Sequence, residues 1–140
     1  MRNAQPIGLS HVAVIGAGYW GKNLIRNFHD LNALGAVCDS DPERLDLFKQ
    51  QYPSAKMYSA YSDVLRDPTI LAVAIATPAE AHADAVREAL LAGKDVFVEK
   101  PLCLSVEEGE GLVALAKKKD RILMVVLRLM SSGVVTSVSK

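Results

Sequence analysis

Three glycines near the start of the chain have the spacing of a phosphate-binding turn. The run Gly16-Ala17-Gly18-Tyr19-Trp20-Gly21 follows an apolar segment and leads into an amphipathic one, so we expect it between a buried strand and a helix. In such a turn the first glycine permits the tight bend, the second admits a pyrophosphate, and the third lets helix and strand pack closely. The helix N-terminus also favours phosphate charge. A chance glycine turn is the alternative, which the flanking segments disfavour.

Asp39 supplies a second element of a dinucleotide site. It ends the second predicted strand, 23 residues (39 − 16) after Gly16. An acid in this place hydrogen-bonds the ribose hydroxyls of an adenosine. A carboxylate repels a 2′-phosphate, and neither arginine nor lysine lies between Asp39 and Glu43. The sequence therefore predicts NAD as the cofactor, in preference to NADP.

Polar residues also follow two later predicted strands. Thr77-Pro78 ends one apolar run and Glu99-Lys100-Pro101 ends the next. Because the carboxyl edge of an open α/β sheet is where ligands bind, both segments are candidates for the site. Lys100 could assist proton transfer or hydrogen-bond a substrate hydroxyl. A plain turn, a solvated charged pair, and a surface or capping role for the nearby His82 remain the alternatives.

The elements that must position these residues alternate along the chain. Short apolar runs and longer amphipathic segments follow one another as in βαβ units with a parallel sheet. Helix starts are indicated by Asp41-Pro42 and by the capping box at 105–108. Strands are predicted at 9–15, 34–39, 56–58, 71–76, 95–98 and 122–127, and helices at 19–31, from 42, at 61–66, 80–91 and 105–119. The prediction is an α/β fold, a single domain with a doubly wound, mainly parallel sheet of the Rossmann type.

Composition limits the possible partners. Sixteen basic residues balance sixteen acidic ones, so no long-range field favours nucleic acid or an anionic membrane. Without a membrane-spanning or signal-like segment, the expected location is the cytoplasm. Cys38 and Cys103 lack metal-ligand spacing, so no metal site is expected. The 140 residues suit one domain and are few for a two-domain dehydrogenase.

Taken together, these motifs resemble the N-terminal domain of the Gfo/Idh/MocA oxidoreductase family. The resemblance spans about residues 9–125 and includes the glycine run, the strand end at Asp39, and Ala76-Thr77-Pro78 with His82. Its most specific segment is 93–102, Gly-Lys-Asp-Val-Phe-Val-Glu-Lys-Pro-Leu. Residues 19–23 and 105–111 look most similar to the branch that oxidises nucleotide-linked sugars, such as UDP-N-acetylglucosamine 3-dehydrogenases and the corresponding uronic acid enzymes.

The resemblance implies a hydride transfer between a nicotinamide and a carbon of a sugar or nucleotide sugar. It implies that the glycine turn contacts the pyrophosphate, that the acid holds the adenosine ribose, and that the later loops line the middle and the nicotinamide end. Lys100 would be the catalytic residue, orienting the sugar hydroxyl or assisting its deprotonation. The implied cofactor-binding residues are Gly16, Gly18, Tyr19, Trp20, Gly21, Asp39, Thr77, Pro78, His82, Glu99 and Lys100.

The resemblance ends after Met124-Val125, where family members continue into a second domain. We expect residues 1–127 to form the dinucleotide-binding domain, residues 128–140 to be an irregular tail foreign to the family, and the C-terminal catalytic domain to be absent through truncation. Alone, such a chain should bind NAD and turn over little substrate. A family-like homo-oligomer would be built through the missing domain. The alternatives are a non-enzymatic dinucleotide-binding module or sensor, or a subunit completed by a separate chain.

Overall fold

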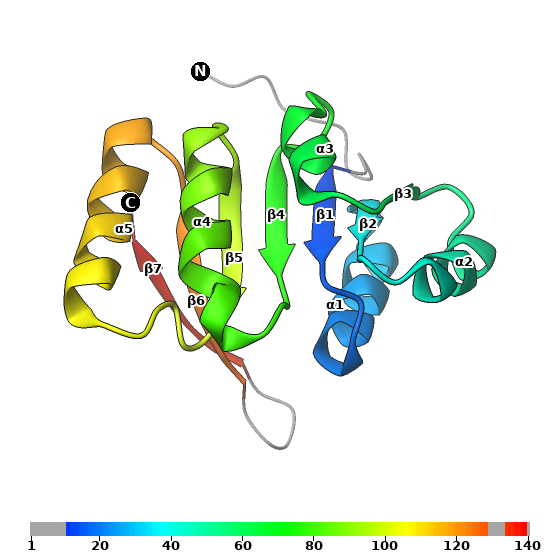
Figure 1. Cartoon of the computed structure of the whole chain (residues 1–140), viewed down its shortest axis with the longest axis horizontal. Helices are drawn as coiled ribbons and strands as arrows, with labels where there is room; N and C mark the ends of the chain where they lie inside the picture. Colours follow the sequence, from blue (N-terminus) through cyan, green and yellow to red (C-terminus); the bar gives the residue numbers. More distant parts are fainter. Residues whose placement is uncertain (1–10, 129–133, 140) are drawn as a thin grey trace.

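The computed structural model describes residues 11–128 and 134–139, and the side chains of residues 11–126. One seven-stranded sheet runs through the molecule in the order β3-β2-β1-β4-β5-β6-β7, with helices packed against it (Figure 1). The strands are β1 (Val12–Ile15), β2 (Leu34–Cys38), β3 (Lys56–Tyr58), β4 (Ala72–Ile75), β5 (Asp95–Glu99), β6 (Leu123–Arg128) and β7 (Val134–Ser139). The helices are α1 (Tyr19–Asp30), α2 (Pro42–Gln51), α3 (Tyr61–Arg66), α4 (His82–Leu91) and α5 (Val106–Lys119), with a 3-10 turn at Ala79–Ala81.

The first six strands are parallel and confirm the predicted Rossmann fold. From β1 the chain moves outward to β2 and β3, then returns to place β4 on the other side of β1. Val14 of β1 thus pairs with Val37 on one side and with Ala74 on the other. Loops from the two halves diverge between β1 and β4, and this reversal of strand order opens a crevice at the carboxyl edge.

The core is divided between the two faces of the sheet. In β1, Ala13 and Ile15 belong to the cluster that includes α4 and α5, whereas Val12 and Val14 pack with Leu24 and other residues of α1 and α2. Helices α4 and α5 lie side by side on the first face (Figure 1). Both faces are covered, which explains why the central strands read as continuous apolar runs rather than alternating ones.

Two predicted helix starts are confirmed by their caps. Asp41 Oδ1 accepts the N–H of Glu43 at 2.9 Å, and Pro42 occupies the first position of α2. Ser105 Oγ accepts the N–H of Glu108 at 3.1 Å at the start of α5. The predicted helix over 80–91 differs at its start, because a 3-10 turn occupies Ala79–Ala81 before α4 begins.

The expectation of an irregular tail over residues 128–140 is wrong for most of that segment. Arg128 is the last residue of β6, and residues 134–139 form β7, antiparallel to β6 with Val134 opposite Arg128. The physical reason is the free edge of β6, whose backbone groups would otherwise lack a partner. A neighbouring segment rich in valine can return across a short connection, as antiparallel pairing allows. Residues 1–10, 129–133 and 140, which were included in the predicted domain and tail, lie outside the described residues.

A polar cluster secures the amino end of the central strands. The carboxylate of Asp67 accepts hydrogen bonds from Lys56 Nζ at 2.9 Å, Tyr58 Oη at 2.6 Å and Thr69 Oγ1 at 2.6 Å. Buried Lys94 donates through Nζ to two backbone carbonyl oxygens of the same loop, at 2.6 and 2.8 Å. The bonds from Thr69, Tyr58 and Lys56 outweigh burial and hold the pKa of Asp67 far below its ordinary value. The cluster therefore carries a carboxylate that is charged at neutral pH.

Candidate functional site

A cavity of about 690 Å³ lies at the carboxyl ends of β1, β2, β4 and β5, where the strand order reverses. Its wall includes Ile15 and Cys38, the last residues of β1 and β2, and Glu99, the last residue of β5. Most of the predicted site residues line it: Gly16, Gly18, Trp20, Asp39, Thr77, Pro78 and Glu99. The fold thus brings together residues that lie up to 83 positions apart (99 − 16) in the sequence.

Two of the three turn glycines are required by the protein's own packing. Gly16 has a φ of +94°, which side-chain-bearing residues rarely adopt, and a Cβ there would lie 3.1 Å from the Ala76 carbonyl. A Cβ on Gly21 would lie 1.9 Å from the carbonyl oxygen of Gly16. These positions therefore bring α1 against β1, as the spacing predicted.

Gly18 has no such internal reason to be glycine. Its φ is −74°, which any residue adopts, and the nearest atom to a Cβ would be Arg44 Nη1 at 3.9 Å. The residue lines the cavity and is the N-cap of α1, where no side chain of the described residues caps the helix. Because Gly18 has no side chain and the space beside it is open, an anionic group can approach the unpaired backbone N–H groups at the start of α1.

Asp39 places a fixed negative charge on the wall of the crevice, directly after β2. Its Oδ2 accepts the N–H of Ala17 at 2.7 Å and its Oδ1 accepts the N–H of Asp41 at 2.8 Å, so it joins the end of β2 to the glycine turn. Burial acts to raise its pKa, but the bonds from Asp41 and Ala17 and the Arg44 guanidinium outweigh burial and hold the pKa below its ordinary value. The remaining lone pairs of this carboxylate can accept hydroxyl groups.

Arg44 is a site residue that the sequence reasoning missed. Its Nη1 lies 3.4 Å from Asp39 Oδ2, and its Nε lies 3.7 Å from Asp41 Oδ2. Arg44 directly follows the interval from Asp39 to Glu43, which holds no cation. Because helical side chains lean toward the helix N-terminus, a residue in the first turn of α2 reaches back to the strand end that precedes it. An arginine three residues after the N-cap Asp41 was the signal that could have found it.

Thr77 offers an unused polar group to the cavity. Its Oγ1 is buried and has no hydrogen-bond partner among the described residues. Buried hydroxyls are almost always paired, so one that lines a cavity without a partner fits a site that a ligand completes. Together with the open face of Gly18, it shows that the residues present fit a bound dinucleotide.

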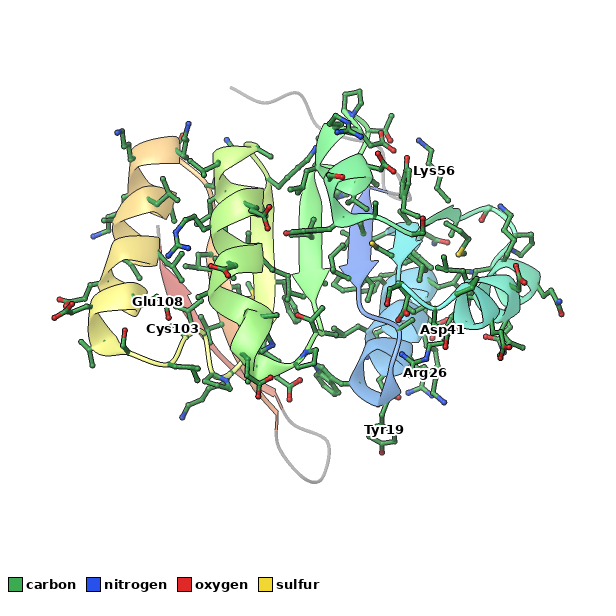
Figure 2. All side chains as sticks on the ribbon, viewed as in Figure 1. Tyr19, Arg26, Asp41, Lys56, Cys103 and Glu108 are labelled. Carbon is green, nitrogen blue, oxygen red and sulfur yellow. The ribbon has the colours of Figure 1, made fainter. Side chains whose placement is uncertain are left out.

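Four predicted site residues lie outside the lining of this cavity. Gly21 is buried beneath the turn, and Tyr19, which is 78% exposed, projects away from the domain (Figure 2). His82 is buried, with Nδ1 2.7 Å from the Pro101 carbonyl oxygen and Nε2 2.7 Å from that of Thr77. It therefore links the two loops that follow β4 and β5. Lys100 directly follows the cavity-lining Glu99 and is exposed, and its N–H donates to the Val126 carbonyl at 2.8 Å.

The lining suits binding better than nucleophilic chemistry. Burial, and then the charges of Asp39 and Asp63, raise the pKa of the Cys38 thiol to about 11, so it stays protonated. Tyr61 donates its hydroxyl to the Ala85 carbonyl at 2.6 Å. Within residues 11–128 and 134–139, no three histidine, cysteine or acidic side chains gather as metal ligands. No helix of that part of the chain has the length and apolar character needed to cross a membrane.

Comparison with known proteins agrees with this geometry. The family described as "Oxidoreductase family, NAD-binding Rossmann fold" matches residues 10–127. A scyllo-inositol 2-dehydrogenase (NAD(+)) of Bacillus subtilis is 38% identical over 104 residues, which are 70% of this chain and 30% of that enzyme. The chain spans 23–33% of the length of the first relatives it matches.

Solved structures share the fold at similar coverage. GenD2 from gentamicin A biosynthesis, in complex with NAD, superposes with a TM-score of 0.79 at 28% identity, over 88% of this chain and 36% of that one. UDP-N-acetylglucosamine 3-dehydrogenase GnnA from Acidithiobacillus ferrooxidans superposes with a TM-score of 0.75 at 25% identity, over 82% and 37% of the two chains.

Proposed function

This chain belongs to the Gfo/Idh/MocA family of oxidoreductases, and from that premise we propose that its cavity binds NAD for hydride transfer to or from a sugar or nucleotide sugar. The observation that carries the proposal is one crevice that unites the open backbone of Gly18 with the ionised carboxylate of Asp39. NAD, when bound, supplies the hydride acceptor or donor at its nicotinamide ring. The protein supplies position and charge.

Each part of the crevice has a proposed task. The backbone of the glycine turn would hold the pyrophosphate at the start of α1, where the helix dipole favours negative charge. Asp39 would accept hydrogen bonds from the adenosine ribose hydroxyls, and its charge would favour NAD over NADP. Thr77 Oγ1 would bond the middle of the cofactor, and Glu99 would lie beside the nicotinamide end.

We assign the substrate end to Lys100. Its backbone is held by the bond to Val126, and its exposed side chain, one residue after the cavity-lining Glu99, would be free to meet a substrate hydroxyl. A sugar-type substrate is supported by the printed names of the inositol and UDP-N-acetylglucosamine dehydrogenases. The relatives are about three times as long, so we propose that residues beyond this chain complete the substrate pocket, support any homo-oligomer and are required for appreciable turnover.

Calorimetric titration of the wild-type chain and of Asp39→Ala with NAD tests the cofactor assignment. Losing hydrogen bonds from ribose hydroxyls to a charged group should weaken NAD binding by about tenfold or more. Asp84→Ala removes an exposed acid of α4 paired with Arg87 and should leave the affinity unchanged. Since Asp39 also holds the glycine turn, urea unfolding of the variant must show that it remains folded at the titration temperature. Wild-type affinity in folded Asp39→Ala would remove the ribose role.

A further inference from the structure

We propose that His82 is a positioning residue: with a proton on each ring nitrogen, it clamps together the two loops that border the cofactor cavity and so supports NAD binding. The inference rests on the proposed function, since Thr77 in one loop and Glu99 at the start of the other line the proposed NAD site. His82 itself is 3% exposed and lies outside the cavity lining. It therefore acts on the cofactor through the loops.

Both ring nitrogens of His82 face oxygen atoms that can only accept hydrogen bonds. Nδ1 lies 2.7 Å from the Pro101 carbonyl oxygen, and Nε2 lies 2.7 Å from the Thr77 carbonyl oxygen. A neutral imidazole has one N–H, so the lone pair of its other nitrogen would face a carbonyl oxygen at this short distance, which is repulsive. An imidazolium has an N–H on each nitrogen and can donate to both carbonyls. The two distances therefore fit the doubly protonated ring.

The two carbonyls belong to segments that carry proposed site groups. Thr77 has the buried Oγ1 that lacks a hydrogen-bond partner among the described residues. Pro101 directly follows Lys100, whose N–H donates to the Val126 carbonyl at 2.8 Å. The Lys100 segment is thus held by β6 on one side and, one residue later, by His82 on the other. A ring that bonds both loops fixes the position of Thr77 relative to Lys100.

The surroundings of the ring make its second proton depend on both loops. Burial and the N-terminus of α4, where His82 is the first residue, both disfavour a cation. The adjoining segments carry other titratable side chains, namely those of Glu80, Asp84, Glu99, Lys100 and Cys103. The two hydrogen bonds of the ring nevertheless go to uncharged carbonyls. When the ring loses a proton, one carbonyl loses its donor and its loop is released. Because bound NAD would contact both loops, binding should favour the clamped state and hence the protonated ring.

Nitrogen NMR of the histidine rings tests the protonation state directly. The intact chain, labelled with nitrogen-15 and saturated with NAD at pH 6, should show a proton on both ring nitrogens of His82. Replacing each of the three histidines in turn by glutamine assigns the signals, and variants of His11 and His29 suffice if His82→Gln does not fold. A His82 ring with one protonated nitrogen under these conditions would overturn the inference.

Calorimetric titration with NAD tests the positioning role. Between pH 6 and pH 8.5 the dissociation constant of the wild type should rise about tenfold, because one charged hydrogen bond is lost. Asp39 and Cys38 should not titrate in this interval, since the pKa of Asp39 lies below its ordinary value and that of Cys38 is raised to about 11. His82→Gln, which can donate to one carbonyl only, should bind NAD about tenfold more weakly at pH 6 and lose the pH dependence. His29→Gln, on the exposed side of α1 beside Asp30, should keep it.

The outcomes separate the two proposals. If NAD binds equally well at pH 6 and pH 8.5, or if His82→Gln keeps the pH dependence of the wild type, the positioning role is overturned while the NAD site stands. If the wild-type chain does not bind NAD at either pH, the proposed function fails and the inference falls with it. A doubly protonated ring, together with a pH dependence that His82→Gln removes and His29→Gln retains, supports the assignment.

Discussion

Replacing Gly18 by alanine should abolish most cofactor binding without harming the fold. The backbone already has a φ of −74°, and the new methyl group would meet nothing closer than Arg44 Nη1 at 3.9 Å. Alanine is a poorer N-cap than glycine, but it also restricts the unfolded chain, and these effects of opposite sign should leave the free energy of unfolding within about 1 kcal/mol of the wild type.

The effect on binding should be much larger. The methyl group would occupy the open space beside the helix start where we place the pyrophosphate, so the cofactor would have to shift away from the backbone N–H groups. An overpacked contact of this kind costs about 1–3 kcal/mol, which corresponds to a loss of affinity of about 5- to 150-fold. Isothermal calorimetry with NAD measures the affinity, and urea denaturation followed by circular dichroism measures the stability.

Gly21→Ala is the matched contrast, three positions along the same turn. Its Cβ would lie 1.9 Å from the carbonyl oxygen of Gly16, so the backbone of α1 or β1 must move and the fold should lose about 3 kcal/mol or more. Gly18→Ala should therefore weaken NAD binding with little change in stability, whereas Gly21→Ala should weaken both. Wild-type NAD affinity in Gly18→Ala, or a large loss of stability in that variant, would refute this account of the turn.

Two further predictions concern stability. Asp67→Asn should lower the free energy of unfolding by about 2 kcal/mol at pH 7, because the hydrogen-bonded carboxylate has a pKa far below its ordinary 3.8. An aspartate with a lowered pKa stabilises the fold above that ordinary value and loses this contribution as the pH falls toward the folded-state pKa, so the difference between wild type and variant in urea unfolding should shrink by about 1 kcal/mol at pH 3. A difference that stays constant with pH would contradict the assignment. Gly111→Ala, on α5 with open space around the new methyl group, should raise the free energy of unfolding by about 1 kcal/mol; a decrease in the urea midpoint would show that the surface of α5 is not as open as described.

Local chemistry explains what could be predicted from the sequence. The glycine turn between an apolar run and a helix, the N-cap at Asp41 and the capping box at Ser105 depend on neighbouring residues, so spacing alone identifies them. The alternation of apolar and amphipathic segments determined the order of strands and helices, and handedness rules then left the doubly wound sheet as the natural arrangement. The parallel sheet in turn predicted where the crevice lies, because the carboxyl ends of parallel strands meet at one edge.

Tertiary structure decided what the candidate residues do at that edge. Spacing placed His82 near the site, but the fold buries its ring between the carbonyls of Thr77 and Pro101. Arg44 on α2 leans back toward the start of its helix and contacts Asp39, so the end of β2 carries a cation as well as an acid. The pairing of β7 with β6 depended on an unfilled sheet edge, which a scan for helical period and core faces does not detect. These three features arise from contacts between elements, whereas the sequence determined the elements from β1 to β6.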